Sequence, residues 1–96
     1  MYVGTLRIDF IVPGSASLKD KRKVMRSMID SLRSRFNASI AEVDFMDLRQ
    51  RGAVGIVCVS NESFHARKML EEIERSIRSR YDIEIVEANF DIISSE

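Results

Sequence analysis

The chain contains few of the residue types on which small functional sites often depend. Its 96 residues include one cysteine (Cys58), one histidine (His65) and no tryptophan. One cysteine excludes an internal disulfide, and one cysteine with one histidine cannot form a Cys/His zinc cluster. Cys58 lies in an apolar run, where a cysteine is usually an inert small hydrophobic residue, and His65 is expected to be a partly buried packing residue. We therefore expect no catalytic residues, no metal, no cofactor and no enzymatic activity.

Long hydrophobic runs and an excess of one charge are also missing. Arg7 and Asp9 interrupt the apolar N-terminal stretch, and no window reaches the ~18 apolar residues of a spanning helix, so neither a signal peptide nor a membrane span is expected. Lys plus Arg number 15, as do Asp plus Glu. A net charge of zero argues against a general polycation that binds any nucleic acid. We expect a cytoplasmic protein with no membrane or DNA partner.

The length and composition are those of one small globular domain. With 45% hydrophobic and 31% charged residues, the chain is neither disordered nor membrane-spanning. We expect a single domain over residues 1–96. Its hydrophobic core is modest at this length, so a homodimer is also expected.

Apolar periodicity predicts six elements in the order β-α-β-β-α-β. They are strands at 6–12, 39–45, 53–59 and from 82 onward, and helices at 18–36 and from a cap at Asn61 or Ser63 to about Arg80. This order predicts an α+β fold, the ferredoxin-like sandwich with two helices on one face of an antiparallel sheet. The apolar run 53–59 is expected at the centre, covered on at least part of both faces. The last strand changes its apolar face between Ile85 and Val86, which predicts a bulge or an edge that pairs with something else.

Charge is distributed unevenly between the two predicted helices. Residues 18–36 contain seven cations and two anions, a net of +5, so the rest of the chain sums to −5. Five of these cations share one arc opposite the apolar stripe, interrupted only by Asp30: Lys19, Arg22, Lys23, Arg26 and Arg33. In the second helix, four pairs of opposite charge at i,i+4 spacing are expected to neutralise each other.

The start of the first helix breaks a local rule, because cations crowd the end where the helix dipole is already positive. Such exceptions are expected at functional sites. Ser17 and Asp20 form a capping box, preceded by a loop of small residues. Free backbone N–H groups, this loop and nearby cations resemble a phosphate-binding corner. We expect this corner to bind a phosphate, most simply from RNA, through Ser15, Ser17, Lys19, Arg22 and Lys23. Arg26 and Arg33 extend the same arc of cations along the helix. A solvated face without a partner is the alternative.

Lys21 is the one charged residue inside the apolar arc of the first helix. Its ammonium must reach an edge or an acid, and Glu42 and Asp44 on the second strand are the candidates. With Gln50 and Arg51, these residues are expected to form a polar network beside the helix start. The alternative interpretation is a hairpin that is held together by side-chain hydrogen bonds.

Four stretches of sequence carry a family resemblance: residues 13–22 (PGSASLKDKR), 35–39 (RFNAS), 41–44 (AEVD) and 48–51 (LRQR). Together they resemble the YlxP-like family of small bacterial proteins over nearly the whole chain. The resemblance implies a ferredoxin-like fold, no assigned enzymatic activity, and genes commonly found among those for ribosome maturation and translation initiation. Arg49 and Gly52 depart from the family pattern, which often has an aromatic residue and an alanine there.

Two functions follow from these observations. The leading hypothesis is a non-enzymatic accessory protein that binds ribosomal RNA or the ribosome through the basic helix face. The predicted central strand has no aromatic residue for base stacking, but recognition of the RNA backbone needs only cations. The alternative is a homodimeric module in which the same corner captures a phosphorylated or carboxylated metabolite.

Overall fold

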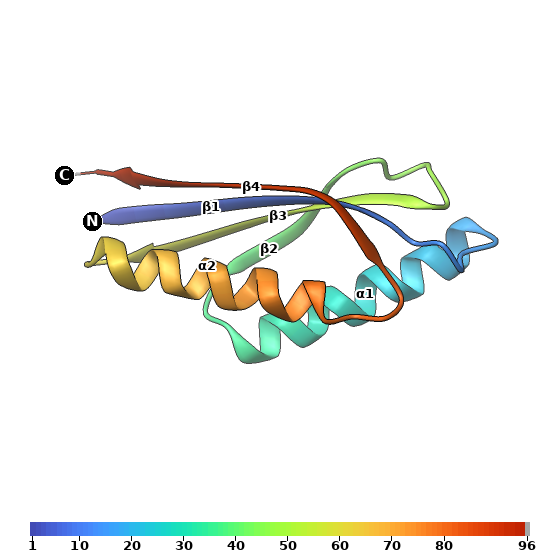
Figure 1. Cartoon of the computed structure of the whole chain (residues 1–96), viewed down its shortest axis with the longest axis horizontal. Helices are drawn as coiled ribbons and strands as arrows, with labels where there is room; N and C mark the ends of the chain where they lie inside the picture. Colours follow the sequence, from blue (N-terminus) through green and yellow to red (C-terminus); the bar gives the residue numbers. More distant parts are fainter. Residues whose placement is uncertain (96) are drawn as a thin grey trace.

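Four strands and two helices make up the fold in a computed structural model that describes residues 1–95. The elements are β1 (Tyr2–Ile11), α1 (Leu18–Arg35), β2 (Ser39–Asp44), β3 (Arg51–Ser60), α2 (Ser63–Arg78) and β4 (Glu84–Ser94). The strands form one sheet in the order β2-β3-β1-β4, and every neighbouring pair is antiparallel. Both helices lie on one face of this sheet and leave the other face open (Figure 1). The predicted ferredoxin-like α+β fold is confirmed.

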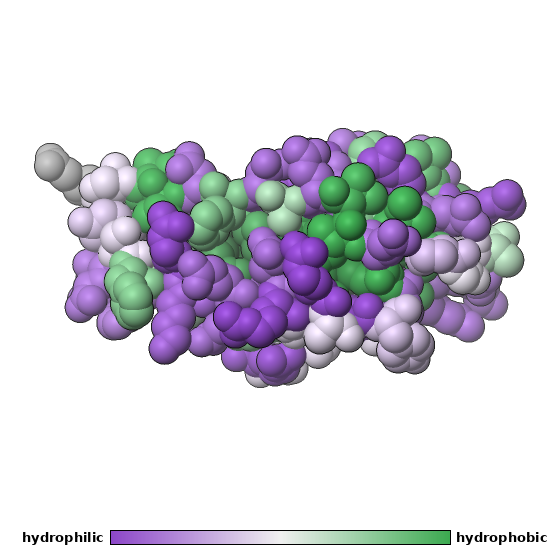
Figure 2. Space-filling model, in the orientation of Figure 1, coloured by the Kyte–Doolittle hydropathy of each residue, from purple (hydrophilic) through white to green (hydrophobic). Residues whose placement is uncertain are grey.

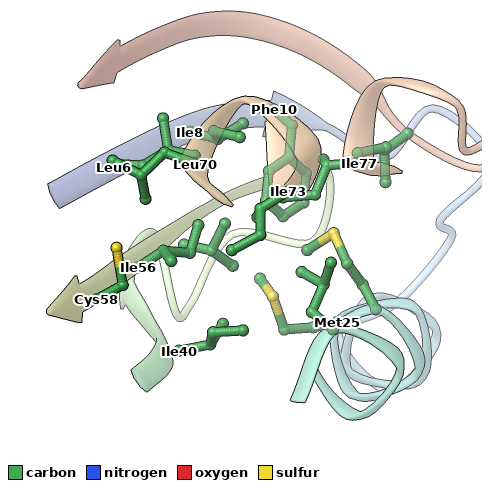
Figure 3. Close-up of a cluster of buried hydrophobic side chains, with 14 of the residues drawn as sticks. Leu6, Ile8, Phe10, Met25, Ile40, Ile56, Cys58, Leu70, Ile73 and Ile77 are labelled. Atoms are coloured by element: carbon green, nitrogen blue, oxygen red, sulfur yellow. The ribbon is translucent and has the colours of Figure 1, made fainter. Parts of the chain in front are cut away.

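The core lies between the helical layer and the sheet. Alternate residues of β1 face the helices, as the period-two pattern predicts, and each helix contributes one apolar stripe. The main contributors from these three elements are Leu6, Ile8, Phe10, Met25, Met28, Leu32, Leu70, Ile73 and Ile77. Figure 3 shows the helix and sheet side chains meeting in this cluster. Burying each of these large side chains stabilises the folded state by about 1.5–3 kcal/mol. The apolar stripe of each helix therefore faces the sheet, and the opposite side of the helix remains exposed to solvent.

The predicted Ser17 cap at the start of α1 is confirmed, but the reciprocal bond of the predicted capping box goes to Ala16 instead of Ser17. The Ser17 hydroxyl accepts a hydrogen bond from the Asp20 backbone N–H at 3.1 Å, and the Asp20 carboxylate accepts one from the Ala16 N–H at 3.1 Å. The bond to Ser17 satisfies one of the donors that a helix start leaves without a partner, and the bond from Ala16 holds the preceding loop against the helix. At the other end, Phe36 adopts an extended conformation and closes the helix one residue earlier than predicted.

The predicted cap of α2 is wrong, because neither Asn61 nor Ser63 caps it. Glu62 occupies the N-cap position and its side chain makes no capping hydrogen bond. The helix also ends at Arg78 rather than near Arg80. The guanidinium of Arg80 instead pairs with Asp82 at 2.8 Å beyond the helix, which stabilises the turn into β4.

A bulge in β4 accounts for the change of face in its apolar pattern. Phe10 of β1 pairs with Ile85, whereas Asp9 pairs with Glu87, so Val86 is the extra residue. The bulge keeps Ile85, Ala88 and Ile92 on the helix-facing side and turns Val86 outward, where it is 54% exposed. Apolar side chains gather on the surface over this bend of the strand (Figure 2). The prediction of a bulge is confirmed.

The central strand β3 is covered only partly on its open face. Val54 and Ile56 point into the core and are buried, as is Ala53 on the opposite side of the strand. Further along the open face, Val59 is 64% exposed. Neither helix of residues 1–95 is long and apolar enough to cross a membrane.

Candidate nucleic-acid interface

Four cations of α1 form an exposed cluster on the side of the helix that faces away from the core. They are Lys19, Arg22, Lys23 and Arg26, called the basic face below. Within the described residues 1–95, none of them lies within 4.0 Å of a carboxylate. At 1.5 Å of rise per residue, the four side chains start within about 10 Å along the helix axis. The predicted exposure of Arg22 and Arg26 is confirmed.

Arg33 belongs to the same arc but has a partner in the protein. Its guanidinium donates a hydrogen bond to the backbone carbonyl of Ile40 in β2 at 2.5 Å. Asp30, which is also exposed, lies between Arg33 and the four cations of the basic face. Arg33 therefore ties α1 to the sheet, and the unpaired charge is concentrated in the first half of the helix.

The two hydroxyl groups of the predicted phosphate corner both make hydrogen bonds within the chain. Ser15 is buried, and its hydroxyl donates to the Ser17 carbonyl at 2.8 Å. The Ser17 hydroxyl accepts a hydrogen bond from the Asp20 N–H, and the Asp20 carboxylate accepts one from the Ala16 N–H. The structure thus corrects the prediction that Ser15 faces an anion, because its hydroxyl proton is used within the chain, whereas Ser17 accepts the cap bond and a role for its own O–H stays a prediction.

Lys21 is fully buried and reaches an acid, as predicted. Its side chain is 1% exposed, its Nζ donates to the Phe45 carbonyl at 2.5 Å, and it lies 3.3 Å from Oε2 of Glu42. Phe45 has a positive φ of 61°, which is uncommon for a residue other than glycine. The Asp44 carboxylate accepts a hydrogen bond from the Phe45 N–H at 2.8 Å and supports this conformation. Lys21 therefore fastens the first turns of α1 to the end of β2.

The connection between β2 and β3 is held against the start of α1 by further hydrogen bonds. The Gln50 amide donates to the Ser15 carbonyl at 3.1 Å, and the Val12 N–H donates to the Gln50 carbonyl at 2.8 Å. The Arg51 guanidinium lies 4.4 Å from the centre of the Phe45 ring. Within the part of the chain that the structure describes, the buried Nε of Arg51 has no hydrogen-bond partner. The hairpin interpretation accounts for these contacts.

Asp44 does not join Lys21, contrary to the prediction of a single network. It lies on the open face of the sheet, where Arg7 Nη2 contacts it at 3.0 Å and Arg7 Nε contacts Asp9 at 2.8 Å. The hydrogen bonds to Asp9 and Asp44 raise the pKa of Arg7, and the bond from Arg7 lowers the pKa of Asp44. Residues two apart on a regular strand share a face, but the bulge between Glu42 and Asp44 in β2 places their side chains on opposite faces.

The open face has the opposite charge to the basic face. Glu87 and Asp91 of β4 pair with Asp9 and Thr5 of β1, so these carboxylates share the side of the sheet that carries Arg7. Sequence reasoning missed this group. The signal was the set of polar residues at alternate positions of β1, which must point away from the core.

Cys58 and His65 show no catalytic arrangement. Burial raises the pKa of the Cys58 thiol, which therefore stays protonated and unreactive, and its sulfur lies 3.9 Å from the Ala66 carbonyl. The prediction that His65 is partly buried is wrong, because the first turn of α2 directs it outward, 3.8 Å from Glu62. Residues 1–95 contain no group of three His, Cys, Asp or Glu side chains that could hold a metal ion.

The cations of α2 have more partners than those of the basic face. Arg78 pairs with Glu74 at 3.1 Å, and Arg67 lies 4.9 Å from the centre of the Phe90 ring. Glu74–Arg78 is the only one of the four predicted i,i+4 pairs that lies within 4.0 Å in the described chain. α2 contains four cations and three anions, so its outer face has little net charge.

Known proteins place the chain in a family without an assigned function. Residues 3–90 match the family model described as "Protein of unknown function (DUF503)". "Uncharacterized protein YlxP" of Bacillus subtilis (strain 168) is 32% identical over 82 residues, which cover 85% of this chain and 89% of that protein. A solved structure from Bacillus cereus, named "Putative Antibiotic Biosythesis Monooxygenase", aligns with 99% of this chain and 95% of its own at 16% identity and a TM-score of 0.42. The chain belongs to the DUF503 family, and the YlxP-like relationship that its sequence predicts is confirmed.

Proposed function

We propose that this chain is a non-enzymatic accessory protein of the cytoplasm that binds ribosomal RNA or the ribosome and acts in ribosome maturation or translation. One observation carries the proposal. The four cations of the basic face are exposed, lie within about 10 Å along one helix, and have no carboxylate within 4.0 Å in residues 1–95.

The arrangement of the basic face costs the free protein stability. Cations near a helix N-terminus are unfavourable by roughly 0.3–1 kcal/mol each, and like charges at i,i+4 add a few tenths. Lys19 and Lys23 form such a pair, as do Arg22 and Arg26. A polyanion reverses this balance, because every phosphate that a cation neutralises releases condensed counterions. The cations of the basic face are therefore unfavourable in the free protein and favourable when they contact a nucleic acid.

The acidic open face favours one orientation of the protein on RNA. Asp9, Asp44 and Asp91 lie on the side of the sheet opposite the helices. A polyanion repels this side and attracts α1. The zero net charge of the chain is then compatible with RNA binding, because the charges are separated between the two faces.

The predicted phosphate-binding corner at the start of α1 has few free groups that could bind a small anionic metabolite. The Ala16 and Asp20 N–H groups and the Ser15 hydroxyl are already bonded within the chain, and the Ser17 hydroxyl already caps the helix. The adjacent hollow, of about 340 Å³, is lined by residues that include Asp20, Tyr81 and Asp82. Two carboxylates at its wall repel a phosphorylated or carboxylated ligand. The geometry thus supports RNA over the metabolite-binding alternative.

Co-sedimentation with ribosomes over a salt series tests the proposal. With about four phosphate contacts, we expect binding at low salt that weakens by on the order of 100-fold between about 50 and 200 mM salt. Absence of association at the lowest salt would overturn the proposal. A rise in melting temperature with nucleotides or phosphorylated metabolites, in the absence of ribosome binding, would instead establish the small-ligand function.

A further inference from the structure

The basic face presents four cations close together on the outer surface of a helix that packs on the sheet. Lys19, Arg22, Lys23 and Arg26 project from the convex surface of a helix that is fastened to the sheet by Lys21. A duplex carries about one negative charge per 1.7 Å of its axis, and a single strand carries half of that. Over the roughly 10 Å of the basic face, a duplex therefore offers about six charges and a single strand about three, so either form provides enough phosphates for about four cations and charge density does not choose between them.

The helix that carries the basic face has no aromatic side chain. Residues 18–35 contain neither Phe, Tyr nor Trp. Proteins that bind single-stranded RNA combine a basic groove with aromatic side chains on which unpaired bases stack. α1 provides cations on a convex surface without such a platform, which fits contact with phosphates and not with splayed bases.

Arginine side chains cover three phenylalanine rings that lie outside the centre of the core. The distance from the guanidinium carbon to the ring centre is 5.1, 4.4 and 4.9 Å for Arg35–Phe36, Arg51–Phe45 and Arg67–Phe90, respectively. Phe36 and Phe45 are also partly buried, so little of each ring is left for a base, and the more exposed Phe90 already has Arg67 over its ring.

The remaining aromatic rings are buried, distant from the basic face or next to acids. Phe10 is in the core, and Tyr2 begins β1 at the end of the sheet opposite the start of α1 (Figure 1). Phe64 adjoins His65, which pairs with Glu62. Tyr81 is fully exposed but shares its hollow with Asp20 and Asp82. Carboxylates beside a ring disfavour the approach of an RNA backbone.

We infer that the RNA bound by this chain is double-helical, and that the basic face contacts its phosphates without stacking on its bases or reading its sequence. The inference rests on the proposed function and names its substrate class. A-form RNA suits such binding, because its bases are read poorly through the deep, narrow major groove and its backbone shape is the main feature presented.

Fluorescence anisotropy with a duplex of about 20 base pairs and with each of its two separated strands tests this inference. We expect the duplex to bind at least ~10-fold more tightly than either strand, and a second duplex of unrelated sequence to bind within ~3-fold of the first. Equal or tighter binding of a single strand, or a sequence preference above ~10-fold, would overturn the inference but leave the proposed function intact. If no RNA and no ribosome binds at the lowest salt, the proposed function itself fails.

The Tyr81→Ala variant provides a second test that does not depend on comparing ligands. Tyr81 is the uncovered aromatic ring nearest to α1, and its full exposure makes the substitution harmless to the core. We expect duplex binding to change by less than ~2-fold. A loss of ~10-fold or more, the effect of removing a stacked base contact, would show that stacking contributes and contradict the inference.

Discussion

α1 and α2 pack beside each other on the same face of the sheet, but they differ in how many of their exposed cations have a partner within the protein. α2 has cations that meet a carboxylate or an aromatic ring, as Arg78 and Arg67 do. The four cations of the basic face on α1 meet neither within residues 1–95. Both helices satisfy the fold with a single apolar stripe, so packing explains neither pattern. This difference between the two helices is the basis of the proposed role of α1 in binding RNA.

The buried stripes of the two helices differ as well. α2 buries Ala66, Leu70, Ile73 and Ile77, whereas α1 buries Lys21 among its apolar residues. A buried ammonium is tolerable only with its partners, the Phe45 carbonyl and Glu42. This contact is the reason that the basic face has a fixed position relative to the β2–β3 connection.

The largest expected effect on stability comes from removing the charge of Glu42. We expect Glu42→Gln to lower the free energy of unfolding by about 3 kcal/mol, because the buried ammonium of Lys21 loses its counter-charge. The double variant Lys21→Met with Glu42→Gln should recover most of this loss, because no buried charge remains. Urea denaturation of the single and double variants measures both. Equal stability of Glu42→Gln and the parent protein would contradict the assignment of this pair.

A smaller effect is expected from the two helix caps. Ser17→Ala should destabilise the protein by about 1 kcal/mol, because the Asp20 N–H loses its acceptor. Glu62→Ser on α2 should stabilise it by about 0.5 kcal/mol, because that helix has no side-chain cap. Thermal unfolding of the two variants gives the comparison, and a shift of the same sign in both would refute the assigned difference between the caps.

The smallest predicted effect concerns the first turn of α1. Lys19→Glu should stabilise the free protein by about 0.5 kcal/mol, because it places an anion near the positive end of the helix and replaces repulsion from Lys23 by attraction. The gain should shrink as salt is added. The same variant should bind ribosomes more weakly. Chemical denaturation and co-sedimentation, measured together, would show whether stability and binding oppose each other at this residue.

The sequence predicted the fold well because one apolar face decides each element. Residues such as Leu6, Leu32 and Ile73 repeat with a strand or helix period, and the bulge at Val86 was visible as a break in that period. The caps of α2 were missed because Asn61, Glu62 and Ser63 are adjacent, and which of them caps the helix depends on backbone angles that the sequence does not show.

The candidate site was predicted only in part. The exposed arc of α1 and the burial of Lys21 follow from helical geometry alone. The inward bonding of Ser15 and the separation of Asp44 from Glu42 depend on how a loop folds back and on a bulge in β2, neither of which has a periodic signal. Binding to RNA and the formation of a homodimer stay predictions.

Charge reversal on the two helices, compared in one ribosome-binding experiment, tests the central claim most directly. The variant Arg22→Glu with Arg26→Glu changes the basic face, and Lys68→Glu with Arg75→Glu makes the same change of charge on exposed positions of α2. Circular dichroism should show that both variants are folded. We predict a loss of at least ~100-fold in ribosome affinity at low salt for the α1 variant and a change within ~3-fold for the α2 variant. Equal losses in both, or unchanged binding of the α1 variant, would contradict the account.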